Sequence, residues 1–272
     1  MLFLLSPAKS LDYDSPIAPE LPTSEPIFTA QSRLVIAQLR QKSAAELCSL
    51  MSISAKLAEL NVQRHRAWSE TPAPEQARQA ALAFNGDVYE GLQAASLSAQ
   101  DWAWAQEHLL ILSGLYGALR PLDLLQPYRL EMGTRLPVPL AEKADAPVAE
   151  NLYQFWAEPL AQYLNTRLSA HQTPIIVNLA SNEYFKAVDT RRVSARVIEC
   201  VFQDEKAGQY KIISFLAKRA RGLMARYAIE TRVQRPEDLR GFDREGYVFD
   251  DALSSADKLV FRRREADRPR AA

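Results

Sequence analysis

The sequence lacks long apolar runs and is poor in cysteine. No apolar run approaches the roughly 20 residues that a membrane-spanning helix needs, and the run Leu2–Leu5 has no basic segment before it. We therefore expect a buried strand at this end rather than a signal peptide, and no membrane contact. The two cysteines, Cys48 and Cys200, lie far apart and outside any CxxC or CxxH pair. Free thiols of this kind fit a cytoplasmic protein and argue against a disulfide scaffold.

Motifs for metals, nucleotides and catalysis are missing as well. The three histidines, His65, His108 and His171, have no metal-ligand spacing to one another or to the cysteines. The sequence contains no GxGxxG motif, no P-loop and no arguable Ser/His/Asp order. We therefore predict no metal site and no cofactor, and no catalytic residue can be named. These absences favour a non-enzymatic protein over an enzyme.

The chain also lacks an excess of charge, with 33 basic and 33 acidic residues. A protein that coats nucleic acid without sequence preference is usually basic throughout. Any contact of this chain with nucleic acid must therefore use a segregated basic patch. Its 272 residues and hydrophobic content of 47% are sufficient for a substantial core.

The pattern of apolar residues predicts a mixed fold. Continuous apolar runs at 2–5 and 174–180 are typical of strands buried on both faces. Amphipathic helices are expected at 28–41 and 152–168, and β-hairpins near 197–215 and 246–263. A helix is also expected at 74–84, a short helix capped by Asp87 at 88–93, and another that begins at Ser98 with Asp101 as an imperfect capping box. The segment 138–150 is expected to be a mobile loop. We predict an α+β protein with one mixed domain over 1–264, in which helices surround a central mixed β-sheet. The charged tail, 265–272, is predicted to be disordered.

The segment 111–136, ILSGLYGALRPLDLLQPYRLEMGTRL, places charges beside buried surface, where they are normally paired or used. One interpretation is a structural ion-pair network. The other is the floor of a cleft, in which Arg120 and Arg129 bind an anion and Asp123 and Glu131 orient them. Polar residues that follow predicted strands join this second interpretation, because such positions often bind ligands. The candidate cleft consists of Lys9, Arg120, Asp123, Tyr128, Arg129, Glu131, Asn178, Ser181 and Lys186.

The segment 44–68 predicts two short helices joined by a tight turn, similar to a helix-hairpin-helix element. Exposed amides of the turn and the positive end of the second helix would bind phosphate without reading sequence. Ser52 and Ser54 stand where such hairpins usually have glycine, and serine tolerates positive φ poorly. A plain packed helical hairpin is therefore an equal alternative. The candidate DNA contacts here are Ser52, Ile53, Ser54, Lys56 and Arg64, with Arg66 nearby.

A second basic element is the helix predicted at 214–228. The segment 211–235 contains seven basic residues and one acidic residue, a net charge of +6 in a neutral chain. At about 100° per residue, its basic side chains fall on one side and its apolar side chains on the other. The alternatives are a solvated face and a surface for phosphate or nucleic acid, and the second is favoured because the balancing acids lie elsewhere in the sequence. The proposed contacts are Lys218, Arg219, Arg221 and Arg226.

Several blocks of sequence resemble the YaaA family of bacterial peroxide-stress proteins. They are SPAKSLDY (6–13), FNGDVYEGL (84–92), SGLYGALRPLDLLQPYRLEMGTRL (113–136), LYQFW (152–156), NLASNEYFKAV (178–188), KRARGLMARY (218–227) and LVFRR (259–263). The blocks occur in order along nearly the whole chain. The resemblance implies DNA binding, protection against hydrogen peroxide and a lowering of free intracellular iron.

Two hypotheses of function follow. The first is a cytoplasmic protein that binds double-stranded DNA without sequence preference during the peroxide response, using the hairpin and the basic helix. The alternative is an enzyme that acts on a nucleotide or another phosphorylated small molecule in a cleft around Arg120, Arg129 and Lys186. Convergence of these polar groups in one deep pocket would favour the enzyme, whereas a broad basic groove would favour DNA.

Overall fold

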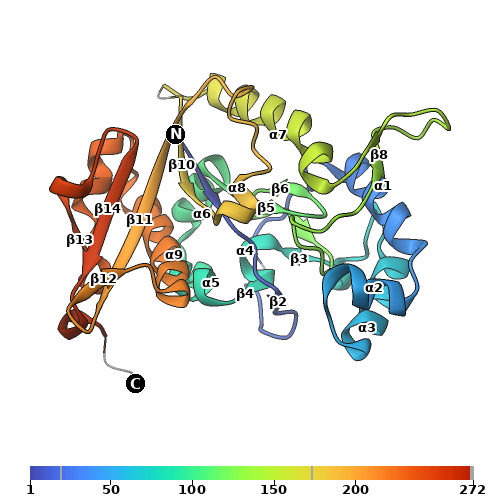
Figure 1. The fold of residues 1–272 in the computed structure, drawn as a ribbon, viewed down its shortest axis with the longest axis horizontal. Helices are drawn as coiled ribbons and strands as arrows, with labels where there is room; N and C mark the ends of the chain where they lie inside the picture. Colours follow the sequence, from blue (N-terminus) through green and yellow to red (C-terminus); the bar gives the residue numbers. More distant parts are fainter. Residues whose placement is uncertain (19, 173, 270–272) are drawn as a thin grey trace.

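An eight-stranded mixed sheet forms the centre of the protein (Figure 1). The computed structural model describes residues 1–18, 20–172 and 174–269. The strand order is β13-β14-β11-β10-β1-β5-β6, and β12 pairs with β11 at the side of this path. The strands are β1 (Leu2–Leu5), β5 (Leu109–Ser113), β6 (Gly117–Leu119), β10 (Ile175–Leu179), β11 (Arg196–Lys206), β12 (Gln209–Lys211), β13 (Val248–Phe249) and β14 (Lys258–Arg263). The predicted α+β class with a central mixed sheet is confirmed.

The parallel strands determine where a ligand site is expected. Strands β5, β1, β10, β11 and β14 run parallel, and β1 is buried along its whole length, as its apolar run predicted. The chain leaves β1 for β5 on one side, whereas it leaves β10 for β11 on the other. Adjacent strands with diverging connections open a crevice outside their carboxyl ends. The ends of β1 and β10 are therefore the natural edge of a site.

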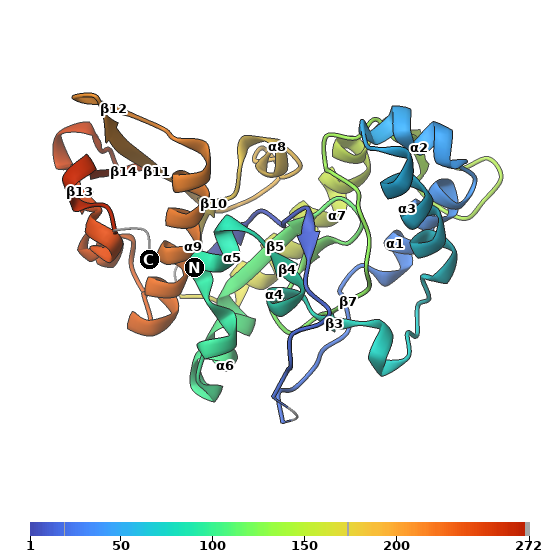
Figure 2. The ribbon, with the colours of Figure 1, turned by 90° about the horizontal axis from the view of Figure 1, so that it is seen from below.

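Helices cover the sheet and extend beyond it (Figures 1 and 2). They are α1 (Thr29–Arg40), α2 (Ala44–Met51), α3 (Ala55–Ala67), α4 (Ala80–Ala83), α5 (Asp87–Leu92), α6 (Ala99–His108), α7 (Leu152–Ser169), α8 (Asn182–Phe185) and α9 (Ser214–Thr231). Short 3-10 turns are η1 (Pro74–Gln76), η2 (Ala94–Ser96), η3 (Pro236–Gly241), η4 (Arg244–Gly246), η5 (Asp251–Leu253) and η6 (Glu265–Asp267). Within the described residues, no helix combines the length and apolarity that crossing a membrane requires.

Local sequence explains most helix starts. Ser98 and Asp101 form the predicted capping box at α6, and Ser43 with Glu46 forms another at α2. Asn151 caps α7 by accepting the N–H of Gln154. The prediction for α5 was wrong in one detail, because Asp87 is its first helical residue and the preceding Gly86 makes no side-chain cap.

Three regions differ from the sequence-based expectation. The helix expected at 74–84 is divided into η1, β3 (Arg78–Gln79), α4 and β4 (Phe84–Asn85), because β3 and β4 pair with distant strands β7 (Leu124–Leu125) and β2 (Ser10–Leu11). The segment 138–150, expected to be a loop, contains the hairpin β8 (Val138–Pro139) and β9 (Val148–Ala149). The tail expected to be disordered from 265 forms η6, and Arg268 donates to the buried carboxylate of Asp204. Residues 270–272 lie outside the described residues.

Helices α5 and α9 cross in direct backbone contact. A Cβ on Gly222 would lie 1.8 Å from the Val88 carbonyl oxygen, and one on Gly91 would lie 2.2 Å from the Arg219 carbonyl oxygen. Glycine is required at this crossing for space, since only a missing side chain lets two backbones approach so closely. The crossing fixes α9 beside the edge formed by β1 and β10, because the Tyr89 hydroxyl of α5 donates to the Ser6 carbonyl.

The helix α3 carries a buried histidine that makes the fold acid-sensitive. His65 is 1% exposed, and neither ring nitrogen has a hydrogen-bond partner within the described part of the chain. Burial, with smaller contributions from Arg64 and Arg40, lowers the pKa of His65 from 6.5 to about 4. The unfolded chain therefore binds this proton more readily than the native protein does. Stability from this residue is present above pH 6.5 and is lost as the pH falls toward the native pKa.

We expect His65→Leu to remove this part of the acid sensitivity. Between pH 7 and pH 4 the wild type should lose about 3 kcal/mol more unfolding free energy than the variant, at 1.36 kcal/mol per pKa unit. Urea unfolding followed by circular dichroism across this range measures the difference. Contributions of other groups cancel when the two proteins are subtracted. A difference that stays constant with pH would show that His65 does not titrate as its burial implies.

Candidate functional site

The carboxyl ends of β1 and β10 meet through two serines. The Ser181 backbone N–H donates to the Ser6 Oγ at 2.8 Å, and the two hydroxyl oxygens lie 3.2 Å apart. Ser181 precedes α8 but makes no side-chain cap to it, since its hydroxyl is engaged with Ser6. The segments that follow β1 and β10 are thus joined by hydrogen bonds at the expected crevice.

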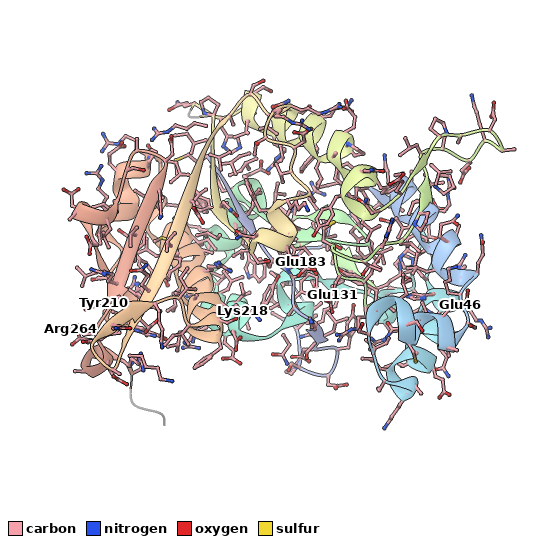
Figure 3. The ribbon with its side chains drawn as sticks, viewed as in Figure 1. Glu46, Glu131, Glu183, Tyr210, Lys218 and Arg264 are labelled. Atoms are coloured by element: carbon pink, nitrogen blue, oxygen red, sulfur yellow. The ribbon has the colours of Figure 1, made fainter. Side chains whose placement is uncertain are left out.

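On one side of this edge lie two charged residues of the segment 111–136, Arg129 and Glu131, together with Lys9. The Lys9 ammonium lies 3.0 Å from the Glu131 carboxylate, and the Arg129 guanidinium lies 3.1 Å from the same group. Lys9 is well exposed, whereas the Arg129 Nε is buried without a partner in the described structure. Figure 3 shows Glu131 near the middle of the molecule, close to Glu183. The structure therefore brings Lys9, Arg129 and Glu131 together, with one carboxylate shared by two cations. Their use as the floor of a ligand cleft stays a prediction.

The other side of the edge is formed by α8 and the start of α7. The Glu183 carboxylate accepts the Gly133 N–H at 3.2 Å, and the Lys186 ammonium lies 5.0 Å from the centre of the Tyr153 ring. Lys186 thus faces the site, held by a cation–π contact rather than by a carboxylate. Tyr153 was missed by the sequence interpretation, although it belongs to the LYQFW block.

Two predicted site residues are used by the fold itself. Asn178 is buried, and its side-chain oxygen accepts the Ala180 N–H at 2.9 Å, which shapes the turn after β10. The Tyr128 hydroxyl is buried 2.6 Å from the Ser113 hydroxyl, and burial raises the pKa of this phenol. The Asn178 side-chain oxygen and the Tyr128 hydroxyl are therefore already engaged within the fold.

Arg120 and Asp123 do not belong to the cleft, which corrects their predicted placement. The Asp123 carboxylate is fully buried and accepts from the Arg120 guanidinium at 2.8 Å and from the Ser24 hydroxyl at 2.7 Å. Arg120 also donates to the Glu25 carbonyl. The pair ties the loop before α1 to the core, so the structural interpretation holds for these two residues.

The predicted hairpin is present as α2, a three-residue turn and α3. Ser52 adopts φ 52, in the left-handed region that glycine usually occupies, and Ser54 caps α3 by accepting the Leu57 N–H. The turn and Lys56 are exposed except for Ile53, which is partly buried. Burial lowers the pKa of Arg64, which lies near Tyr13. The geometry shows two helices joined by a tight turn. It does not confirm a helix-hairpin-helix element, and the use of this turn for DNA stays a prediction.

The basic side of α9 is largely neutralised by the fold. Arg219 forms a bidentate pair with Glu245, and Arg226 pairs with Glu230 and donates to the Gln93 carbonyl. These acids are brought to α9 by the tertiary structure, which the sequence argument did not anticipate. Arg221 is half-buried, its pKa is lowered by burial, and its Nε has no partner in the described structure. Of the four predicted contacts, Lys218 alone is exposed, and the other three are partly buried.

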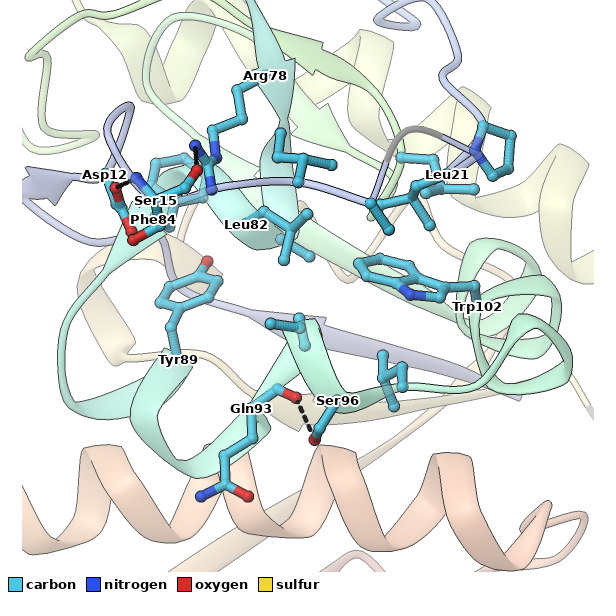
Figure 4. Close-up of a pocket in the computed structure, with 18 of the residues that line it drawn as sticks. Asp12, Ser15, Leu21, Arg78, Leu82, Phe84, Tyr89, Gln93, Ser96 and Trp102 are labelled. Atoms are coloured by element: carbon cyan, nitrogen blue, oxygen red, sulfur yellow. Dashed lines mark hydrogen bonds between the residues drawn. The ribbon is translucent and has the colours of Figure 1, made fainter.

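A separate cavity of about 930 Å³ lies between the loop after β2 and the helices α4 to α6 (Figure 4). Its wall is mainly apolar and includes Leu21, Leu82, Tyr89 and Trp102. None of the residues predicted for the cleft or for DNA contact lines it. The polar groups of the predicted cleft therefore do not converge in this cavity.

The described residues contain no group of three or more His, Cys, Asp or Glu side chains arranged to hold a metal ion. Cys200 is buried, and desolvation raises the pKa of its thiol to about 12, which leaves it protonated and unreactive at neutral pH. The β1 and β10 edge combines the cations Lys9, Arg129 and Lys186 with two serine hydroxyls and the carboxylates of Glu131 and Glu183. The cations and hydroxyls are groups that can bind an anion.

Known proteins similar to this chain cover nearly all of it. A UPF0246 protein of Bordetella avium is 61% identical over 264 residues, which are 97% of this chain and 99% of that protein. UPF0246 proteins of Paracidovorax citrulli and of a Polaromonas species are 61% and 57% identical to this chain. Each match covers 98% of this chain and the whole of the other protein. The family described as peroxide stress protein YaaA matches residues 1–253. The chain therefore belongs to the peroxide stress protein YaaA family, and this membership supports a role in peroxide stress.

Proposed function

We propose that the protein binds double-stranded DNA in the cytoplasm without sequence preference, and that this binding protects DNA during the peroxide response. The observation that carries the proposal is a set of cations without carboxylate partners on one side of the molecule. Within the described residues, Lys56, Arg64, Lys186 and Lys218 form no ion pair, although 23 ion-pair contacts occur elsewhere. Other exposed cations in the described part of the chain, such as Lys143, Lys206 and Arg135, also pair with no carboxylate. Lys56, Arg64, Lys186 and Lys218 are singled out by their place along one side of the molecule, where they remain available for phosphate.

Their placement fits a single elongated ligand. In Figure 2, α2, α8 and the start of α9 lie along the same side, and Lys218 and Glu183 lie near the centre in Figure 3. Arg64 on α3 lies near Tyr13, two residues after β2. In Figure 1, β2 lies between α3 and the centre of the molecule. A duplex running along this side would meet the hairpin at one end and α9 at the other.

The turn before α3 supplies a second type of phosphate contact. The first N–H groups of a helix have no intrahelical acceptor, and Ser54 takes only that of Leu57. The amides of Ala55 and Lys56 thus point out of the helix start, beside an exposed ammonium. Helix starts of this kind bind phosphate through amides and the helix dipole. Such contacts carry no base information, which agrees with binding of unrelated sequences.

A lowering of free iron would then be indirect. No metal-binding cluster occurs among the described residues, and the proposal does not require one. Occupied DNA is shielded from oxidants formed nearby, and an effect on iron handling would arise through other components of the cell.

The salt dependence of DNA binding tests the proposal. We expect Lys56→Gln, Arg64→Gln and Lys218→Gln together to lower the slope of log K against log salt by about 2.7, at roughly 0.9 per phosphate contact. Fluorescence anisotropy with two unrelated duplexes between about 50 and 200 mM salt measures the slope. The loss should be equal for both sequences.

A matched control changes three cations that are already paired. Arg191, Arg235 and Arg264 are highly exposed and each contacts a nearby aspartate. Their replacement by glutamine removes the same total charge, and the slope should stay within about one unit of the wild type. Equal slopes for all three proteins would refute a DNA surface made of Lys56, Arg64 and Lys218.

A further inference from the structure

Two large apolar side chains are exposed to solvent where α9 begins. Phe215 is 61% exposed and Ile212 is 59% exposed. A single exposed apolar residue is ordinary, but two within four positions, one of them aromatic, form a local apolar point that no described segment covers. The next residues of α9 behave differently, because Ala217 and Ala220 are buried against the core.

Lysines flank this apolar point. Lys211, the last residue of β12, precedes Ile212. Lys218 lies three residues after Phe215 on α9, which places the side chains of Phe215 and Lys218 on the same side of the helix. Lys218 lies near the centre of the molecule in Figure 3, and α9 begins on the side that also carries α8 and α2 in Figure 2. Phe215 therefore stands beside a cation that we propose contacts phosphate.

The helix that presents Phe215 is held rigidly. Gly222, two turns further on, has its backbone in contact with the Val88 carbonyl, and Arg219 is fixed by Glu245. Phe215 is thus an exposed ring on a fixed element, and it loses little conformational freedom when it stacks on a flat partner.

We propose that Phe215, supported by Ile212, stacks on nucleobases of DNA that has lost regular pairing, such as a bulge, a gap or a single-stranded end. This inference rests on the proposed DNA binding and names its preferred substrate. An aromatic ring beside cations is the arrangement by which proteins hold unpaired bases, the ring binding the base and the cation binding the phosphate. Apolar side chains also insert between base steps and partly unstack them, which costs least where pairing is already lost.

A second copy of the protein is a less suitable partner. A stable interface buries about 800 Å² on each side, far more than two side chains can supply. Around a two-fold axis, Lys211 and Lys218 would also face their own copies, and like charges oppose such contact. Anionic DNA matches both the apolar ring and the flanking charge.

The test compares an intact duplex with the same duplex carrying a two-nucleotide bulge that contains 2-aminopurine. We expect Phe215→Ala to bind the bulged DNA about 10-fold more weakly, within the range that base stacking supplies. Its affinity for the intact duplex should change less than 2-fold. The wild type should quench 2-aminopurine fluorescence by stacking, Phe215→Ala should not, and Phe215→Tyr should retain the quenching.

Val248→Ala is the matched control, because Val248 is 65% exposed on a different element, β13. It should bind both DNAs like the wild type, and unfolding midpoints should be unchanged for all variants. Equal binding of the bulge by Phe215→Ala and the wild type, with a salt slope intact on the duplex, overturns the stacking role alone. Failure of the wild type to bind either DNA overturns the proposed function as well. A dimer in sedimentation that Phe215→Ala dissociates assigns the residue to a copy of the chain and overturns the proposal.

Discussion

Gly222→Ala is expected to destabilise the protein by about 3 kcal/mol or more, the upper range for overpacking a tight contact. In an exposed helix interior, the same change would stabilise by roughly 0.5–1 kcal/mol, because alanine has the better helix propensity. The reversal of sign arises from the crossing of α5 and α9. A Cβ at this position would lie 1.8 Å from one backbone atom and 2.8 Å from another, and neither can rotate away.

Unfolding in urea, followed by circular dichroism, measures this loss. Gly133→Ala is the matched control, because a Cβ there meets the end of the flexible Glu183 side chain at 3.2 Å. Its cost should stay below about 1 kcal/mol, as for other surface changes. A Gly222→Ala variant as stable as the control would mean that α5 and α9 can separate freely. The position of Lys218 and Phe215 on α9 would then not be fixed.

The elements that the sequence predicted correctly are those specified by local patterns. The apolar run of β1, the amphipathic faces of α1 and α7 and the capping box of α6 each depend on residues close in sequence. The segment 74–84 was misassigned because its structure depends on distant partners. Its alanines favour a helix, but Arg78 and Gln79 pair with Leu125 and Leu124, about 45 residues away. Tertiary pairing overrides helix propensity here.

The same rule explains only part of the candidate site. Lys9 follows β1 directly, as local sequence indicates. Arg129 and Glu131 reach it because their segment, which comes after β7, packs back on Gly114 at the end of β5. The fate of the basic helix could not be read from local sequence. Arg219 is neutralised by Glu245, 26 residues further along the chain. A net charge counted over one segment therefore overstates the charge that remains available to DNA.

The C-terminal part of the sheet contains a buried ion pair of a kind that sequence cannot reveal. Asp204 is fully buried in β11, and its carboxylate accepts from the Arg263 guanidinium at 2.8 Å and from the Tyr247 hydroxyl at 2.7 Å. Arg263 is 2% exposed and packs over the Tyr247 ring, 4.3 Å from its centre. Its other carboxylate contact, with Glu245, is longer at 3.5 Å. Most of the compensation for the buried charge of Arg263 therefore comes from Asp204.

Asp204→Ala is expected to cost about 3–5 kcal/mol, because it leaves a buried guanidinium with a weak partner and a buried hydroxyl with none. Asp204→Asn should cost less, since the amide oxygen still accepts from Tyr247. Asp267→Ala, which removes the exposed partner of Arg264, should cost below about 1 kcal/mol. All three are measured as unfolding free energies in urea at pH 7.

The double variant Asp204→Leu with Arg263→Met separates a charge left unpaired from a loss of packing. Apolar side chains of similar size often replace a buried ion pair without loss, so the double variant should recover most of the stability that Asp204→Ala loses. The network lies at the base of the β11–β12 hairpin, from which the chain enters α9. If the double variant is less stable than Asp204→Ala, packing around this hairpin dominates, and the ion pair is not the main support of the strand that precedes α9.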